Sequence, residues 1–134
     1  MSSMRMLAQE EENDDAAEVT WEDQQRINSF SKLNTRVRGL EEKLEELKQE
    51  KEALDDLATE LELADEDEEV LYKVGEAFLH MPLARALKRL EKDQASIDQR
   101  ISALATSAGV CETEMKELKV LLYAKFGRAI NLDD

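Results

Sequence analysis

VLYKVGEAFLHM, residues 70–81, is the segment of the sequence whose pattern favours β-strand over helix. Two apolar runs flank Gly75-Glu76, and glycine at the first central position of a two-residue loop favours a type II′ hairpin turn. Such a turn places Val74 opposite Ala77 and extends the pairing outward in both strands. The segment therefore predicts a β-hairpin.

Alternation of side chains along the two strands predicts one wholly apolar face and one mixed face. The apolar face consists of Val70, Tyr72, Val74, Ala77, Leu79 and Met81. The mixed face consists of Leu71, Lys73, Phe78 and His80. A lone two-stranded hairpin is marginal in water and has two unpaired edges, and no other segment reads as a strand. We therefore expect strands of other chains to complete the sheet, and we expect this chain alone to leave the apolar face uncovered.

The composition argues against a large globular core. Of 134 residues, 37% are charged, and the aromatic residues are three Phe, two Tyr and one Trp. A net charge of −14 argues against nucleic-acid binding, which needs clustered Lys and Arg. The single cysteine, Cys111, excludes an internal disulfide and fits a reducing cytoplasmic or nuclear compartment. No apolar run approaches the roughly 18 residues of a membrane span.

Before the hairpin, the sequence predicts an acidic tail and one long helix. Residues 1–18 contain an acidic run without periodicity, which is typical of a disordered tail. Thr20 has the chemistry of a helix N-cap, and Asp23 stands at the capping-box spacing. Apolar residues then recur at steps of three and four, which predicts a coiled-coil helix over about residues 20–63. Its seam is Phe30, Leu33, Val37, Leu40, Leu44, Leu47, Lys51, Leu54, Ala58 and Leu61.

After the hairpin, Pro82 can open a second helix, expected over about residues 82–126. The same steps return in its seam: Leu83, Leu87, Leu90, Gln94, Ile97, Ile101, Leu104, Ala108, Cys111, Met115, Leu118 and Leu122. Two seams of similar length joined by a chain reversal predict an antiparallel pair. Gly109 is expected to mark a close approach of the two helices, and the polar seam residues Lys51 and Gln94 are expected in neighbouring layers, where they can fix register.

The second helix is expected to stop near Phe126, because Gly127 suits the position after a helix end. Residues 127–134 then form a short tail in which Ala129, Ile130 and Leu132 have little left to pack on.

No motif in the sequence points to catalysis, a metal or a cofactor. His80 has no second His or Cys at a ligand spacing, so a position on a strand face near a subunit contact is its default interpretation. Cys111 lies at a seam position without an accompanying His, which favours a core residue over a nucleophile. The many carboxylates lie on helix faces without a cleft to desolvate them. We expect no enzyme activity and no cofactor.

Apolar residues at the two helix ends farthest along the chain from the hairpin allow two interpretations. They staple the helix ends together, or they stay exposed and hold apolar segments of other proteins. Both interpretations can hold for different residues. The residues concerned are Trp21, Phe30, Tyr123 and Phe126.

The sequence resembles the prefoldin family. The resemblance rests on the helix opening VTWEDQQRINSF (residues 19–30), a hairpin between long antiparallel helices, and the ending LLYAKFGRAINLDD (residues 121–134). It covers residues 19–134 as a single domain, and the one hairpin is similar to the β class of subunits.

The resemblance implies a mainly α fold, a long antiparallel two-helix coiled coil whose hairpin joins an intersubunit β-barrel. It implies a heterohexamer with two α-class and three further β-class subunits, with Val70, Tyr72, Val74, Ala77, Leu79 and Met81 in assembly. Unfolded actin and tubulin chains would be held without ATP and passed to the cytosolic chaperonin. The client-binding residues would be Trp21, Ile27, Tyr123, Phe126, Ile130 and Leu132.

A structural coiled-coil adaptor or tethering subunit is the alternative. Heptads alone do not separate the two functions. The hairpin favours the co-chaperone, because an adaptor of this length has no need for two strands with open edges.

Overall fold

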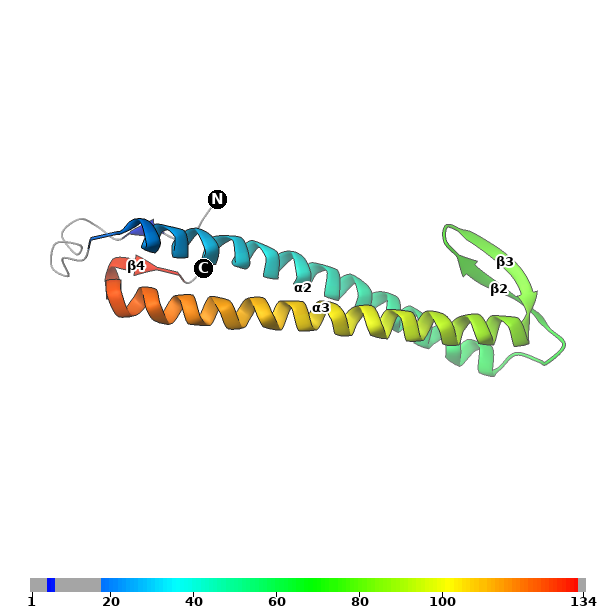
Figure 1. Ribbon diagram of the computed structural model, residues 1–134. Helices are drawn as coiled ribbons and strands as arrows, with labels where there is room; N and C mark the ends of the chain where they lie inside the picture. Colours follow the sequence, from blue (N-terminus) through cyan, green and yellow to red (C-terminus); the bar gives the residue numbers. More distant parts are fainter. Residues whose placement is uncertain (1–4, 7–17, 133–134) are drawn as a thin grey trace. The chain divides into compact units, whose positions relative to one another are not determined.

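A computed structural model describes residues 5–6 and 18–132. Two long helices, α2 (Trp21–Glu62) and α3 (Leu83–Phe126), contain most of these residues. Between them β2 (Glu69–Val74) and β3 (Ala77–Pro82) form the hairpin (Figure 1). The remaining elements are β1 (Arg5–Met6), the 3-10 helix η1 (Gly127–Ala129) and β4 (Ile130–Asn131).

The chain divides into two compact units, and both helices pass through both. The terminal unit consists of residues 1–41 and 106–134, and the hairpin unit consists of residues 42–105. In each unit a segment of α2 lies antiparallel to a segment of α3 (Figure 1). The fold is thus two long helices and a small antiparallel hairpin, as predicted.

The start of α2 confirms the predicted capping box. The Asp23 backbone N–H donates to Thr20 Oγ1 at 3.1 Å, and the Thr20 backbone N–H donates to Asp23 Oδ2 at 3.1 Å. Two amide groups that the helix itself leaves unpaired are satisfied in this way. Aspartate therefore serves where glutamate or glutamine is more common.

The hairpin has the predicted register. Val74 pairs with Ala77, and the ladder runs through Tyr72 opposite Leu79 to Val70 opposite Met81. Gly75 has a φ of 63°, a conformation that side chains with a Cβ rarely adopt. The ladder continues one pair beyond the prediction, so Pro82 ends β3 instead of opening α3.

The predicted seams are buried or half-buried with one exception. Leu87 is 41% exposed, whereas Ala86 is completely buried. The seam of α3 therefore steps from residue 83 to residue 86 and then to residue 90. The physical reason is that Ala86 packs in the same cluster as Tyr72 of the hairpin, where the small side chain lets the strand approach the helix.

The polar seam residues each bond to an acid on the other helix. Lys51 Nζ donates to Asp98 Oδ1 at 2.6 Å, and Gln94 Nε2 donates to Asp55 Oδ1 at 3.3 Å. The two pairs cross between α2 and α3 in the hairpin unit. Register fixation by Lys51 and Gln94 remains a hypothesis with this geometry in its favour.

The close approach expected at Gly109 is absent. A Cβ built on Gly109 would meet no described atom within 4 Å, and the residue is exposed. Gly109 therefore lies on the solvent side of α3, next to Ala108, which does face the core.

A second strand pair, which the sequence did not predict, joins the two ends of the described chain. Arg5 pairs with Asn131 and Met6 with Ile130 in an antiparallel bridge between β1 and β4. Residues 5–6 thus depart from the disordered tail expected over residues 1–18, and most of that range lies outside the described residues.

Candidate interaction surfaces

The hairpin rests on its own helices through a cluster of buried apolar residues, which we call the hairpin cluster. Its members are Leu61, Tyr72, Met81, Leu83, Ala86 and Leu90, with Val70 and Val74 packed against them. The expectation that a single chain leaves the apolar face uncovered is therefore wrong for Tyr72 and Met81. Two helices flank the strands at this end of the unit, and they supply the apolar cover that the sequence pattern did not reveal.

Tyr72 anchors the hairpin with a hydrogen bond as well as by burial. Its hydroxyl donates to Asp93 Oδ2 at 2.8 Å, and Arg89 Nε donates to Asp93 Oδ1 at 3.2 Å. Burial, followed by the bond to the Asp93 carboxylate, raises the pKa of Tyr72 well above its ordinary value. The phenol stays neutral and the three side chains hold β2 against α3.

The other face of the hairpin is open. Phe78 is 61% exposed and Leu71 50%. Ala77 and Leu79 of β3 are exposed as well, although the register places them on the same face as Tyr72 and Met81. Among the described residues β2 and β3 pair with each other alone, so each retains an unpaired outer edge. Apolar side chains on both faces are typical of strands that are covered on both sides. That signal was present in the sequence at Leu71 and Phe78, which the sequence analysis assigned to the mixed face.

A second cluster, which we call the terminal cluster, closes the helix ends in the terminal unit. It consists of Phe30, Leu122, Phe126, Ala129, Ile130 and Leu132, with Ile27, Met115, Leu118 and Tyr123 packed against it. The Leu132 backbone N–H donates to Tyr123 Oη at 3.1 Å. The expectation that the last apolar residues have little to pack on is wrong, because η1 turns the chain back against the helix ends.

The terminal cluster corrects part of the predicted client-binding set. Phe126, Ile130 and Leu132 are buried, with Phe126 only 1% exposed, so they staple the helix ends and offer no surface to another protein. Ile27 and Tyr123 are half-buried at the edge of the cluster. Trp21, in contrast, is 74% exposed at the first residue of α2.

Asp23 connects the two helices of the terminal unit. Its side chain is almost completely buried and accepts bonds from Lys125 Nζ and, at 3.2 Å, from Arg26 Nη1. The hydrogen bond from Lys125 and those within the capping box lower the pKa of Asp23 from 3.8 to about 2. The carboxylate is therefore charged under neutral conditions and ties the start of α2 to the end of α3.

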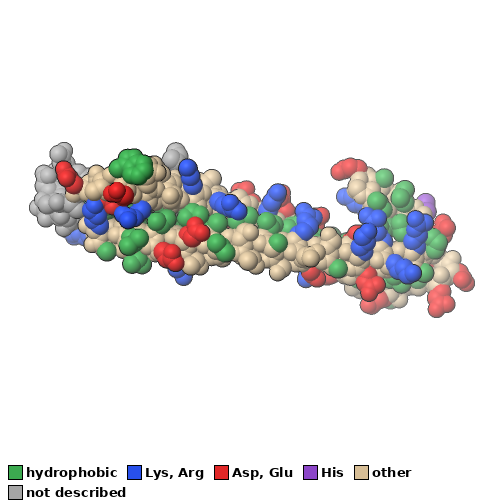
Figure 2. Space-filling model, in the orientation of Figure 1, with side chains coloured by type: hydrophobic (Ala, Val, Ile, Leu, Met, Phe, Trp, Pro, Cys, Tyr) green, Lys and Arg blue, Asp and Glu red, His purple; other side chains and the backbone are tan. Residues whose placement is uncertain are grey.

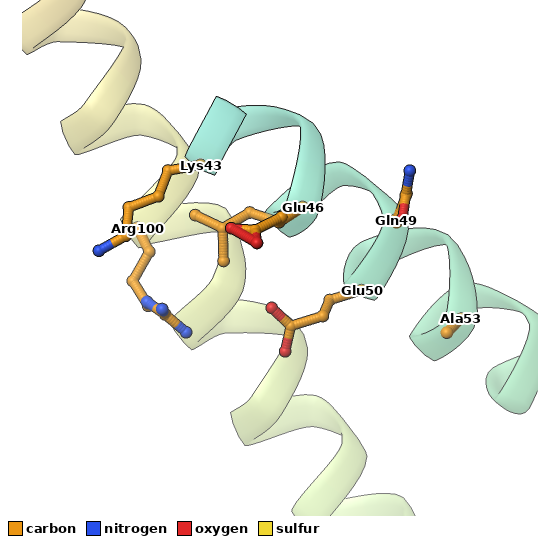
Figure 3. Close-up of a pocket in the computed structure, with 7 residues that line it drawn as sticks. Lys43, Glu46, Gln49, Glu50, Ala53 and Arg100 are labelled. Atoms are coloured by element: carbon orange, nitrogen blue, oxygen red, sulfur yellow. The ribbon is translucent and has the colours of Figure 1, made fainter. Parts of the chain in front are cut away.

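Two cavities of the hairpin unit are grooves whose lining includes several charged side chains. The first, of about 460 Å³, is shown in Figure 3, where residues of α2 face Arg100 of α3. Its lining is Lys43, Glu46, Leu47, Gln49, Glu50, Ala53 and Arg100. The second, of about 530 Å³, lies beside the hairpin turn, with Tyr72, Gly75 and Asp93 in its wall. Both grooves are open to solvent, unlike the enclosed site that small molecules use.

The structure shows no chemical site at Cys111 or His80 in the described part of the chain. Cys111 is buried in the seam, as expected, and His80 is exposed on β3. Within residues 5–6 and 18–132, no group of three or more His, Cys, Asp or Glu side chains could hold a metal ion. Neither helix in the described part of the chain combines the length and hydropathy needed to cross a membrane.

Exposed hydrophobic side chains are visible in both units (Figure 2). In the terminal unit they include Val19, Trp21, Val120 and Leu121, and in the hairpin unit Leu71, Phe78 and Leu79. These two sets of residues are the candidate interaction surfaces of the chain.

Known proteins are similar to this chain in sequence and in fold. The family model described as a prefoldin subunit matches residues 24–129. Prefoldin subunit 4 of Saccharomyces cerevisiae is 43% identical over 130 residues, covering 97% of this chain and 99% of the yeast protein. Prefoldin subunit 4 of Homo sapiens is 33% identical over 133 residues, covering 98% of this chain and 96% of the human protein.

A solved structure agrees with the fold. The prefoldin beta subunit from Thermococcus strain KS-1 superimposes with a TM-score of 0.72 at 14% identity, covering 83% of this chain and 97% of that one. The helices, the single hairpin and the full-length relatives point to the same conclusion: this chain belongs to the prefoldin subunit family.

Proposed function

We propose that this chain is one subunit of a hetero-hexameric co-chaperone, in which its hairpin joins strands of neighbouring subunits and its terminal unit holds unfolded proteins. The neighbours are two α-class and three further β-class prefoldin subunits. The observation that carries the assembly role is the hairpin itself. Among the described residues its strands keep unpaired outer edges, and Leu71, Phe78 and Leu79 are exposed while Tyr72 anchors β2 to α3.

This division refines the set of residues proposed for assembly. Ala77 and Leu79 offer direct contact, whereas Tyr72 and Met81 support the hairpin from beneath. Val70 and Val74 are half-buried, so their exposure is intermediate between those of the two groups. Phe78 and Leu71 join the proposed contact surface from the other face.

The test of assembly compares Phe78→Glu with Phe78→Leu in the complex purified from its source, measured by native mass spectrometry. A buried glutamate is costly at an interface, so Phe78→Glu is expected to release this subunit, while Phe78→Leu retains the hexamer. Both isolated chains should keep wild-type helix content by circular dichroism, because Phe78 is exposed. A wild-type complex that is a homodimer, or a hexamer unaffected by the glutamate, would reject the proposal.

For client holding, we assign the main contact to Trp21, with Ile27 and Tyr123 at the edge of the same unit. The support is the large exposed area of an aromatic side chain that the described residues leave uncovered. Each such contact is weak, and several subunits acting on one unfolded chain raise the avidity.

The test of client holding uses Trp21→Ser in the assembled complex and measures suppression of aggregation of a denatured protein. Suppression is expected to fall with the hexamer intact and with little change in the stability of the chain. Val110→Ser, which replaces an exposed apolar side chain of α3 with the same polar residue, is the control for altered surface polarity. Unchanged suppression by Trp21→Ser would remove this residue from the client surface.

The remaining parts of the proposal concern partners and compartment. Clients of the actin and tubulin class would pass to the cytosolic chaperonin, and the charge of −14 suits a contact with basic surface that weakens as salt rises. The work would be holding and transfer without catalysis or cofactor. The cytoplasm, with the nucleus as a second compartment, is where we expect the complex.

A further inference from the structure

The short strand β4 has a main chain that is held rigidly from one side. Ile130 and Leu132 are buried in the terminal cluster, while Asn131 between them is exposed. The Leu132 backbone N–H donates to the hydroxyl of Tyr123 on α3. β4 is therefore anchored by two side chains and one hydrogen bond.

The remaining edge of β4 points away from the helices at Asn131. Consecutive backbone N–H groups of a strand point in opposite directions. Because the N–H of Leu132 is directed at Tyr123, the N–H and C=O of Asn131 are directed to the opposite edge. That edge is where β1 lies, with Arg5 as the partner of Asn131.

In the described part of the chain, β4 contacts β1 through a short backbone ladder. Within the described residues the ladder consists of two residue pairs, Arg5 with Asn131 and Met6 with Ile130. An edge that is read through main-chain hydrogen bonds accepts any extended segment, because the backbone groups are the same in every sequence. Two pairs give little free energy, so a competing segment can displace the strand that occupies the edge.

We propose that the edge of β4 is a binding site for an extended segment of an unfolded polypeptide, and that β1 of the same chain occupies this site as a competing self-ligand. The proposal rests on the proposed client holding and adds its mode, which is strand addition at Asn131. Trp21 lies exposed in the same unit and offers an aromatic surface for apolar side chains of the added segment.

An unfolded chain suits this site better than a folded partner. Its amide groups are unpaired with protein, and it presents extended backbone along its whole length. Because β1 competes for the edge, the apparent affinity for the unfolded chain depends on the fraction of time for which the edge of β4 is free. If β1 covered the edge about nine-tenths of the time, freeing it would tighten binding by about tenfold.

The experiment uses the assembled complex and a fluorescein-labelled, permanently unfolded probe, reduced and carboxymethylated α-lactalbumin, with fluorescence anisotropy as the readout. Arg5→Pro removes the N–H through which β1 pairs with Asn131, and Arg5→Ala removes the same charge but keeps the N–H. Arg5→Pro is expected to lower the apparent Kd several-fold relative to Arg5→Ala. Equal affinities of these two variants would overturn the proposal.

The second pair of variants addresses β4. Asn131→Pro removes the edge N–H, whereas Asn131→Ala keeps it. Combined with Arg5→Pro, the Asn131→Pro change is expected to abolish the gain in affinity, and Asn131→Ala is expected to preserve it. A gain that survives Asn131→Pro would show that the probe binds elsewhere. The melting temperatures of the Asn131 variants reveal whether the terminal cluster stays folded, and the Arg5 pair tests the proposal without altering β4.

A peptide with the sequence of residues 3–8 supplies a further measurement. Added in trans to the Arg5→Pro complex, it is expected to compete with the probe, and the same peptide with proline at position 5 is not. Failure of the first peptide to compete would contradict the self-ligand. If the wild-type complex and all variants fail to bind the probe, client holding itself fails, which is a different result from equal binding by all of them.

Discussion

Asp23 is the residue whose chemistry depends most on the fold. It caps α2 within its own turn and accepts from Lys125, 102 residues further along the chain. A buried carboxylate is tolerated here because each of its oxygens receives a donor. The cap was visible in the sequence as a spacing of three residues, whereas the bond to Lys125 needed α3 to return beside α2.

The first prediction is a pH dependence that Asp23 confers on the terminal unit. Because folding lowers the pKa of Asp23 from 3.8 to about 2, the charged carboxylate stabilises the folded chain at pH values above about 4. This stabilisation is lost as the pH falls from about 4 to about 2. Urea midpoints of the wild type are expected to fall more steeply over this range than those of Asp23→Asn, which keeps a cap oxygen but has no charge. Parallel profiles for the two proteins would contradict the prediction.

Gly109 provides the second prediction. It lies inside α3 with no described atom within 4 Å of a built Cβ, so alanine fits without a clash. Gly109→Ala is expected to raise the free energy of unfolding by about 1 kcal/mol, which is the helix-propensity difference between the two residues. Chemical denaturation of the wild type and the variant measures this difference in the free energy of unfolding. Gly75→Ala is the opposite control and is expected to destabilise, because φ at Gly75 is 63°.

At the scale of elements, α3 and the hairpin determine each other's packing. The heptad steps alone favour Leu87 as a seam residue, but the helix turns Ala86 toward the core and Leu87 toward solvent. The cause is β2, whose Tyr72 lies over this part of α3 and bonds to Asp93. Because α3 contacts both a strand and another helix here, the heptad spacing of a two-helix coiled coil does not predict which of its residues are buried.

The third prediction distinguishes these two seam registers. Ala86→Leu is expected to destabilise the chain by about 1–3 kcal/mol through overpacking of the hairpin cluster. Leu87→Ala is expected to change stability by less than about 0.5 kcal/mol, because its side chain is largely exposed. If Leu87 were the seam residue, its truncation would instead cost about 2–5 kcal/mol. Urea unfolding of the two variants decides between the registers.

At the scale of the whole molecule, stability is divided between two apolar clusters. The terminal cluster belongs to the terminal unit and the hairpin cluster to the hairpin unit. The proposed roles follow the same division, with client holding in the first unit and assembly in the second. In a chain with 37% charged residues, many of the buried apolar side chains belong to these two clusters, where they hold the helices together.

The fourth prediction tests this division. Phe126→Ala is expected to cost about 3–5 kcal/mol, since the ring is completely buried in the terminal cluster. Hydrogen exchange should then accelerate for amides of the terminal unit and remain close to wild type at β2 and β3. Tyr72→Ala is the reciprocal variant, with faster exchange expected in the hairpin unit. Uniform acceleration throughout the chain by both variants would show a single cooperative unit instead.

The sequence by itself determined the two long helices and the hairpin of this protein. Local chemistry placed the capping box at Thr20, the turn at Gly75 and the end of α3 before Gly127, and heptad spacing predicted the helices to within a few residues. These features depend on neighbours within one or two turns, which sequence patterns record. The resemblance to prefoldin depended likewise on contiguous motifs at the two ends of the domain.

Only the tertiary structure decided which apolar residues are covered. It buried Tyr72 against Ala86, turned Ile130 and Leu132 back onto the helix ends, left Trp21 exposed and paired β1 with β4. Apart from the exposure of Trp21, each of these outcomes joins residues from different elements of the chain. Hydrophobic burial is non-directional, so a sequence shows that a side chain seeks cover but not which distant surface supplies it.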